Sequence, residues 1–220
     1  SPSSIEAAIT DKTKAILAVH LYGQLADMLS IKTISEKHNL LIIEDAAQAI
    51  DSFYTFRNGL KKALGSIGHL AAFSFHETKN IISGEGGMLV INDEQFASRA
   101  EIIWEKGTNR SAFFRGEVDK YTWQEVGSSF LPGELIAAFL WAQLENLEKI
   151  QTRRKQIWAK YYDDFSFLEQ SGKLKLPIVP SYATNNAHMF YLLTDSIEQR
   201  DALIGFLKEN KIYAVFHYIS

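Results

Sequence analysis

The stretch Leu40-Leu41-Ile42-Ile43-Glu44-Asp45-Ala46-Ala47-Gln48 passes from four apolar residues to charged and polar ones within one short segment. This pattern predicts a buried strand, Leu40 to Ile43, that ends in polar groups. The same change occurs at Ser74-Phe75-His76-Glu77-Thr78-Lys79-Asn80, which follows a second apolar run. In an open α/β sheet the carboxyl ends of parallel strands open onto one crevice, where ligands bind. We therefore expect Asp45 and Lys79 to meet at one edge of a sheet.

Strand and helix patterns alternate through the first two thirds of the chain, which predicts crossover connections and a mostly parallel sheet flanked by helices. Besides Leu40 to Ile43, the predicted strands are 15–19, 70–75 and 88–91. The predicted helices are 27–38 and 96–104.

The pattern changes after Pro132, which suits the first turn of a helix. Helical spacing runs from there to Ile150 and again from Ile157 to Leu168. A compact αβ segment follows, with predicted strands at 189–193 and 212–216 around a helix that Ser196 and Gln199 would cap. These observations predict a large domain at 1–148 and part of a small domain at 149–220.

Composition excludes several classes of protein. The chain has 220 residues, 46% hydrophobic, with a net charge of −3, so it carries no basic field for nucleic acid or an anionic membrane. It contains no cysteine, which rules out disulfides, thiol catalysis and Cys-based zinc sites. The apolar runs are far shorter than the roughly 20 residues of a membrane helix. We expect a soluble, cytoplasmic protein.

A lysine and a carboxylate brought to one crevice suit pyridoxal phosphate (PLP) chemistry, in which the lysine forms a Schiff base and the acid holds the pyridinium nitrogen. Spacing alone leaves other interpretations open. Lys79 is also compatible with an ordinary solvated lysine, and Asp45 with a helix cap. The segment His76-Glu77-Thr78-Lys79 begins like a zinc-protease helix, but Lys79 replaces the second histidine. No metal site is predicted.

Three further side chains fall near these two. Gln48 lies three residues after Asp45 and is expected to contact the cofactor ring or its phenolic oxygen. Ser74 and His76 alternate with Phe75 and therefore share one strand face. Ser74 would donate to the cofactor phosphate, whereas the spacing of His76 favours a structural histidine. Gly84-Glu85-Gly86-Gly87 lacks the spacing of a phosphate loop and predicts a tight turn.

Together these segments resemble the DegT/DnrJ/EryC1/StrS family of sugar-nucleotide aminotransferases. The similarity spans essentially the whole chain. It rests on Thr13 to Ile16, Val19 to Gly23, Glu44 to Ala49, Ser74 to His76 with Lys79-Asn80, Gly84 to Gly87, and Gly107 to Arg110. The resemblance implies a type I fold of PLP-dependent transferases and a homodimer with composite active sites.

Within this family the chain is most similar to the dTDP-4-amino-4,6-dideoxygalactose transaminases, through segments such as Phe113 to Trp123, Asn186 to Tyr191 and Ala214 to Ile219. This similarity implies transfer of an amino group from glutamate to a dTDP-4-keto-6-deoxy sugar, in the synthesis of bacterial surface glycans. A UDP- or GDP-linked 4-keto sugar is the alternative acceptor.

The resemblance also assigns roles to single residues. Lys79 would be the Schiff-base lysine and the acid/base of the proton shift, Asp45 the partner of the pyridinium nitrogen, Gln48 a contact to the ring and Ser74 a contact to the phosphate. Asn109 would reach the phosphate of the neighbouring subunit's cofactor. His188, Tyr218 and His76 are weaker candidates for the substrate side.

Members of the family are considerably longer, and their N-terminal regions supply a phosphate-binding turn and an aromatic ring that stacks on the cofactor. The sequence is therefore expected to be an internal piece of a longer enzyme, truncated at both ends. A second hypothesis is that this piece alone is catalytically silent and keeps the fold as a binding domain.

Overall fold

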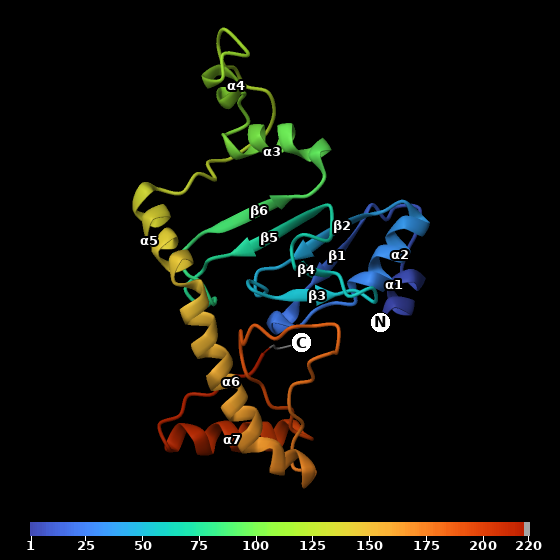
Figure 1. Ribbon diagram of the computed structural model, residues 1–220, viewed down its shortest axis with the longest axis vertical. Helices are drawn as coiled ribbons and strands as arrows, with labels where there is room; N and C mark the ends of the chain where they lie inside the picture. Colours follow the sequence, from blue (N-terminus) through green and yellow to red (C-terminus); the bar gives the residue numbers. More distant parts are fainter. Residues whose placement is uncertain (218–220) are drawn as a thin grey trace. The chain divides into compact units, whose positions relative to one another are not determined.

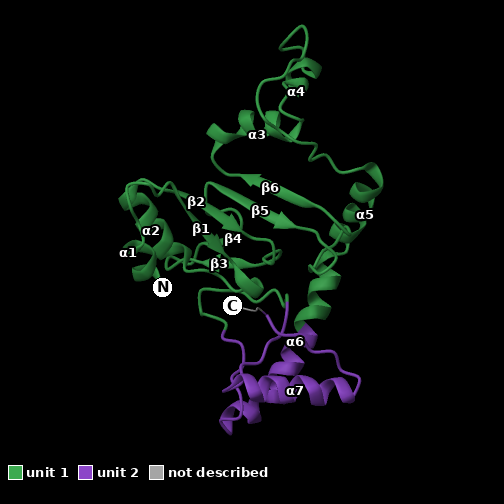
Figure 2. Cartoon of the chain, turned by 180° about the vertical axis from the view of Figure 1, so that it is seen from behind, with its two compact units in different colours: residues 1–155, 179–188 green, residues 156–178, 189–220 purple. Residues whose placement is uncertain are grey.

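The computed structural model describes residues 1–217. The chain forms two compact units, one of residues 1–155 and 179–188 and the other of residues 156–178 and 189 onward (Figure 2). The predicted boundary near residue 148 falls in the first turn of helix α6 (Leu147–Gln170), and the division into domains at 148 stays a prediction.

The first unit is built on a four-stranded sheet with the order β1-β2-β5-β6 (Figure 1). Strands β1 (Ala15–Val19), β2 (Leu41–Asp45) and β5 (Leu70–Ser74) are parallel, and β6 (Gly87–Ile91) pairs antiparallel with β5. Parallel neighbours need crossover connections, and α2 (Met28–His38) supplies the one between β1 and β2. The predicted α/β class with a mostly parallel sheet is confirmed.

Alternate residues of β1 and β2 form the core with α2. Ile16, Ala18 and Ile42 are buried on one face of the sheet. Met28 and Ile31 of the helix are buried as well. Helix α2 begins at Asp27, whose carboxylate accepts from the backbone N–H of Ser30, and ends at Asn39 in the left-handed conformation, a position that asparagine tolerates. The short helix α1 (Pro2–Ala7) packs beside it.

The opposite face of the sheet presents apolar side chains to solvent. Leu17 is 61% exposed and Leu89 is 55% exposed, although both lie in strands. Val19, Asp45 and Ala72 are register partners across β1, β2 and β5, and register partners share a face. The side chain of Asp45 therefore belongs to the open face.

A small two-stranded hairpin was not predicted. Strands β3 (Phe53–Thr55) and β4 (Lys61–Ala63) pair antiparallel, and the ring of Tyr54 stacks on Tyr182 with centroids 5.0 Å apart. Three-residue strands offer too little periodicity for a sequence pattern, and here the packing of Tyr54 fixes them.

The rest of the first unit is helical or irregular. It comprises the 3-10 turns Leu21–Gly23 (η1) and Glu94–Phe96 (η2), α3 (Ala97–Trp104), α4 (Arg110–Phe114), α5 (Glu134–Glu145) and the start of α6. Helix α5 has no buried residue and carries large exposed side chains such as Leu135 and Trp141.

The second unit joins the remainder of α6 to α7 (Ile197–Glu209) and the segments between them. An aromatic cluster holds it together: Trp158 stacks on Tyr162 at 5.2 Å, and Phe190 packs against Trp158 and Tyr161, each at 5.4 Å between centroids. The predicted cap of α7 is confirmed, because Ser196 Oγ accepts from Gln199 N at 3.2 Å.

The two strands predicted in this unit are wrong. Residues 189–193 form no strand, and only Leu193 pairs, through an isolated bridge to Lys175. Residues 212–216 are irregular as well. Both runs are apolar enough for strands, but a strand also needs a neighbour along its length. Among the described residues, the packing of Phe190 on α6 takes the place of such a ladder.

Candidate functional site

The carboxyl end of β2 positions Asp45. It is the last residue of the strand and half-buried, and its Oδ1 accepts from the backbone N–H of Ala47 at 3.1 Å. Its main chain is held on both sides, because His20 N donates to Asp45 O at 3.1 Å and Ala46 N donates to Ala72 O at 2.9 Å. Backbone bonds therefore set the place of this carboxylate.

The neighbouring strand brings Ser74 to the same face. Asp45 pairs with Ala72, and Ser74 lies two residues further along β5, so strand alternation turns both side chains to one side. Lys79 follows in the next loop with a half-buried side chain, and its backbone N donates to His76 O at 2.9 Å. The carboxylate, the hydroxyl and the loop that carries the amine thus come from the carboxyl ends of adjacent parallel strands.

Gln48 connects this edge to the loop after β1. Its Oε1 accepts from Tyr22 N at 2.6 Å, and Tyr22 has a positive φ of 58°. The backbone oxygen of Gln48 accepts from Asn186 Nδ2 at 2.8 Å. Gln48 is therefore fixed from two sides, next to Asp45 along the chain.

His76 lies in a turn of its own. Its Nδ1 bonds to Thr78 Oγ1 at 2.9 Å and accepts from Thr78 N at 3.2 Å, while Nε2 lies 3.8 Å from Glu85 Oε1. These contacts order the turn that leads to Lys79. A role for His76 toward substrate stays a prediction.

Asn109 is the N-cap residue of α4, and its side chain makes no bond to the first turn of that helix. Its Oδ1 accepts from Thr122 N at 2.7 Å, which ties the loop after α3 to the segment that follows α4. The predicted reach of Asn109 into a neighbouring subunit stays a prediction.

The loop that carries Asn109 depends on close backbone contact at Gly107. This residue has φ of +75°, and a Cβ there would lie 1.9 Å from the backbone oxygen of Glu125. We expect Gly107→Ala to separate the two segments and to increase amide hydrogen exchange across residues 105–129. Gly116→Ala is the matched control, because Gly116 has nearly the same φ, +74°, with no atom within 4 Å of its Cβ position.

The control variant retains only the strain of a left-handed alanine, about 1–2 kcal/mol. Gly107→Ala adds the steric clash and is expected to destabilise the protein by clearly more than that in urea unfolding. Equal exchange and equal unfolding midpoints in the two variants would show that the close contact is unimportant.

His188 and Tyr218 were both predicted on the substrate side. His188 is only 8% exposed, and its Nδ1 bonds to Asn80 Oδ1 at 2.7 Å, inside a buried group of amide side chains. Tyr218 lies outside the described residues. The substrate roles of both stay predictions, and the position of His188 beside the residue that follows Lys79 is unexpected from sequence.

Glu44 is the most buried charge near the site, with 0% exposure. Its carboxylate accepts from His20 Nε2 at 3.0 Å and from the backbone N–H groups of Gly65, Ile67 and Gly68 at 2.9, 2.8 and 2.6 Å. Burial alone would raise the pKa of Glu44, but the bonds from His20 and these amides outweigh it and hold the pKa below its ordinary value of 4.5. A glutamate on the same buried face of β2 as Ile42 is the sequence signal for such a buried carboxylate.

We expect Glu44→Gln to lower the free energy of unfolding at neutral pH by about 2–4 kcal/mol, because an amide NH₂ would face backbone donors. The lowered pKa means that the carboxylate contributes stability above the ordinary pKa of glutamate, and that this contribution is lost as the pH falls through the folded value. The stability gap between wild type and variant should therefore narrow in acid. Urea unfolding in a series of buffers measures it, and a gap that widens in acid would contradict the assignment.

Two cavities lie in the first unit. One, of about 410 Å³, is lined by Phe75, Ser83, residues 85–87 and apolar side chains of α5 and the segment before it. The other, of about 630 Å³, lies at the opposite end of the strands, beside His69 and Asn92. Neither is lined by Asp45, Gln48, Ser74 or Lys79, so the strand register and the loop contacts, and not the cavities, define the candidate site.

Within residues 1–217, none of the helices combines the length and apolar character that crossing a membrane requires. The same residues contain no group of three or more His, Cys, Asp or Glu side chains placed to hold a metal ion.

A family model matches residues 1–220, and its description is the DegT/DnrJ/EryC1/StrS aminotransferase family. The chain belongs to this family. Among curated family relatives, the pleiotropic regulatory protein of Geobacillus stearothermophilus is 36% identical over 218 residues, which cover 99% of this chain and 54% of that protein. The spore coat polysaccharide biosynthesis protein SpsC of Bacillus subtilis is 34% identical, with 99% and 56% covered.

Among solved structures of the family, DesV of S. venezuelae, in complex with a ketimine intermediate, superposes with a TM-score of 0.84 at 33% identity. The match covers 99% of this chain and 54% of DesV. The predicted type I fold of PLP-dependent transferases is therefore confirmed. The chain spans about half the length of the relatives that it matches.

Proposed function

We propose that the protein containing this chain is a PLP-dependent sugar-nucleotide aminotransferase. One observation carries the proposal: in a chain of an aminotransferase family, Asp45 and Ser74 share a sheet face at the ends of adjacent parallel strands, and the loop of Lys79 follows directly. An acid, a hydroxyl and an amine at one sheet edge form the donor set that PLP requires.

The residues fit the cofactor in chemical type. Lys79 would supply the amine that holds the cofactor, and that amine would afterwards act as the general acid/base of the proton shift. Asp45 would place a negative charge against the ring nitrogen, Gln48 would contact the ring and Ser74 would donate to the phosphate. When bound, PLP supplies a protonated ring that withdraws electrons from the reacting carbon.

The overall reaction moves one amino group. Glutamate gives up its amine and becomes 2-oxoglutarate, and the keto oxygen of the sugar is replaced by that amine. We infer that the acceptor is dTDP-4-keto-6-deoxyglucose and that the product is dTDP-4-amino-4,6-dideoxygalactose. The sequence segments similar to those transaminases support this choice, and the alternative acceptor is a UDP- or GDP-linked 4-keto sugar.

We further propose a cytoplasmic homodimer that acts on these small molecules and binds neither nucleic acid nor membrane. The exposed apolar side chains of α5 support self-association, because large apolar patches commonly mark interfaces. The net charge of −3 supports the absence of a nucleic-acid partner. In this dimer Asn109 would reach the phosphate of the cofactor in the neighbouring subunit.

The substrate assignment predicts a measurable preference. The full-length protein, supplied with glutamate and PLP, is expected to convert the dTDP-linked 4-keto sugar with a higher kcat/KM than the UDP- and GDP-linked forms. Measuring the 2-oxoglutarate formed from glutamate in the presence of each of the three sugars tests it. A clear preference for UDP or GDP would overturn the choice of nucleotide and leave the reaction class standing.

The alternative of a silent fragment concerns residues 1–220 alone. Incubation of this piece with PLP, followed by borohydride reduction and peptide mass analysis, distinguishes a competent cofactor site from a silent binding domain. A covalent adduct at Lys79 supports a competent cofactor site in this piece, and its absence favours the binding-domain hypothesis.

A further inference from the structure

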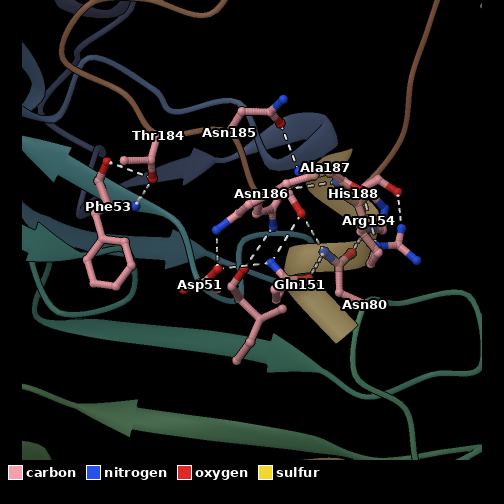
Figure 3. Close-up of polar contacts among 12 residues, drawn as sticks. Asp51, Phe53, Asn80, Gln151, Arg154, Thr184, Asn185, Asn186, Ala187 and His188 are labelled. Carbon is pink, nitrogen blue, oxygen red and sulfur yellow. Dashed lines mark hydrogen bonds and ion pairs between the residues drawn. The ribbon is translucent and has the colours of Figure 1, made fainter. Parts of the chain in front are cut away.

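A buried network of amide side chains lies beside the candidate site, wholly within the first unit (Figure 3). Its members are Asn80, Gln151, Asn186 and His188, all buried, with Asn186 at 0% exposure. They come from three places in the chain: the residue after Lys79, the first turns of α6 and the segment 184–188. Buried polar groups are costly unless they are bonded, so the bonds of this network define its geometry closely.

The side chain of Asn186 holds the turn that follows Asp45. Its Nδ2 donates to the backbone oxygens of Gln48 and Ile50 at 2.8 and 2.9 Å, and its Oδ1 accepts from His188 N at 3.1 Å. One amide therefore bonds two carbonyls of the turn that carries Gln48.

The backbone of Asn186 holds the other side of the site. Its carbonyl oxygen accepts from Asn80 Nδ2 at 2.8 Å and from Gln151 Nε2 at 3.2 Å. Asn80 Nδ2 also donates to Gln151 Oε1 at 2.9 Å, and Asn80 Oδ1 accepts from His188 Nδ1 at 2.7 Å. An amide oxygen only accepts, so His188 carries a proton on Nδ1. The side chain next to Lys79 is thus fixed by three bonds.

Space around Asn186 is equally restricted. A Cβ on Gly23 would lie 2.1 Å from Asn186 Oδ1, so the loop after β1 approaches this amide directly. Arg154 holds the two residues that follow Asn186, because its Nε and a terminal nitrogen donate to the backbone oxygens of Ala187 and His188 at 3.1 and 2.6 Å.

We propose that Asn186 is a positioning residue, which sets the separation between the Asp45–Gln48 turn and the loop of Lys79. Its side chain bonds the carbonyls of Gln48 and Ile50, and its carbonyl bonds the side chain of Asn80, next to Lys79. This proposal rests on the proposed function, because it takes the turn after Asp45 and the loop of Lys79 as two parts of one cofactor site. The acid and the amine must each meet a fixed point on a rigid ring, so the spacing of their loops decides whether both contacts form together.

The test uses the full-length protein and two isosteric variants one residue apart. Asn186→Asp replaces the NH₂ group by an oxygen that faces the carbonyls of Gln48 and Ile50. Asn185→Asp is the matched control, because Asn185 Oδ1 only accepts, from Ala187 N at 2.8 Å, and a carboxylate oxygen does the same. The readouts are the Kd for PLP, the pH midpoint of the absorbance of bound PLP, and hydrogen exchange of residues 46–50 and 76–82 without cofactor.

We expect Asn186→Asp to weaken PLP binding about tenfold or more, to shift the pH midpoint and to speed exchange in both segments. Asn185→Asp should match wild type. A residue that only stabilised the core would lower the unfolding midpoint without moving the pH midpoint. If Asn186→Asp does not fold, Gln151→Met, which removes one donor to the Asn186 carbonyl, is expected to shift the same readouts less far.

The outcomes separate this proposal from the proposed function. If wild type takes up PLP at Lys79 and the folded variants match it in affinity, pH midpoint and exchange, the positioning role is wrong and the function stands. If wild type binds no PLP, the proposed function fails and so does the role in the cofactor site.

Discussion

Lys79→Ala in the full-length protein is expected to lower kcat for amino transfer by about 10⁴-fold or more. The lysine would serve twice, as the group that attaches the cofactor and as the acid/base that moves the proton, and an acid/base group alone contributes about 10²–10⁴-fold. The turn itself should survive, because its bonds from Lys79 N to His76 O and from Thr78 N to His76 Nδ1 do not use the lysine side chain.

Three measurements follow: turnover, the visible absorbance of added PLP, and the mass of the peptide that carries cofactor after borohydride reduction. Lys12→Ala is the control, because Lys12 is an exposed lysine in the loop before β1. The control should keep wild-type turnover and labelling. Labelling of a different lysine in wild type, or a Lys79→Ala variant with more than a tenth of wild-type turnover, would disprove the role of Lys79.

The parts of the fold that sequence predicts well are those determined by local pattern. β1 and α2 match their predicted extents to within a residue, because their apolar periodicity is complete within the segment. The predicted strand 189–193 fails for the opposite reason. Its residues are apolar, but strand formation depends on a neighbouring ladder, and Phe190 instead packs on Trp158 and Tyr161.

The residues of the candidate site also differ in whether the sequence predicts them. Asp45 and Ser74 are the last residues of adjacent parallel strands, and Lys79 follows in the next loop, so a rule about parallel sheets predicts their common edge without knowledge of the fold. Asn186 has no such signal. It bonds to Gln48, 138 residues away in sequence, and to Asn80, 106 residues away, and an asparagine in a polar segment is indistinguishable from a surface residue until those contacts are known. The family resemblance predicted His188 on the substrate side, whereas its contact with Asn80 is visible only in the structure.

Asp45→Asn is expected to lower kcat about 10²–10³-fold with little effect on stability. The change removes the negative charge that would face the protonated ring nitrogen, and preorganised charges of this kind are worth about that much in rate. An asparagine Oδ1 still accepts from Ala47 N, as Asp45 Oδ1 does at 3.1 Å. The strand end keeps its bonds from His20 N to Asp45 O and from Ala46 N to Ala72 O.

Because those backbone bonds remain, the free energy of unfolding should change by no more than about 0.5 kcal/mol. Turnover of the full-length variant tests the loss of kcat, and urea unfolding tests the unchanged stability. Asp11→Asn is the control, because it makes the same change of charge at an exposed loop position. A large loss of rate with unchanged stability assigns the effect to the charge, since the interaction strengthens as the ring takes up electrons in the transition state. Near-normal turnover of Asp45→Asn would mean that another group holds the ring proton.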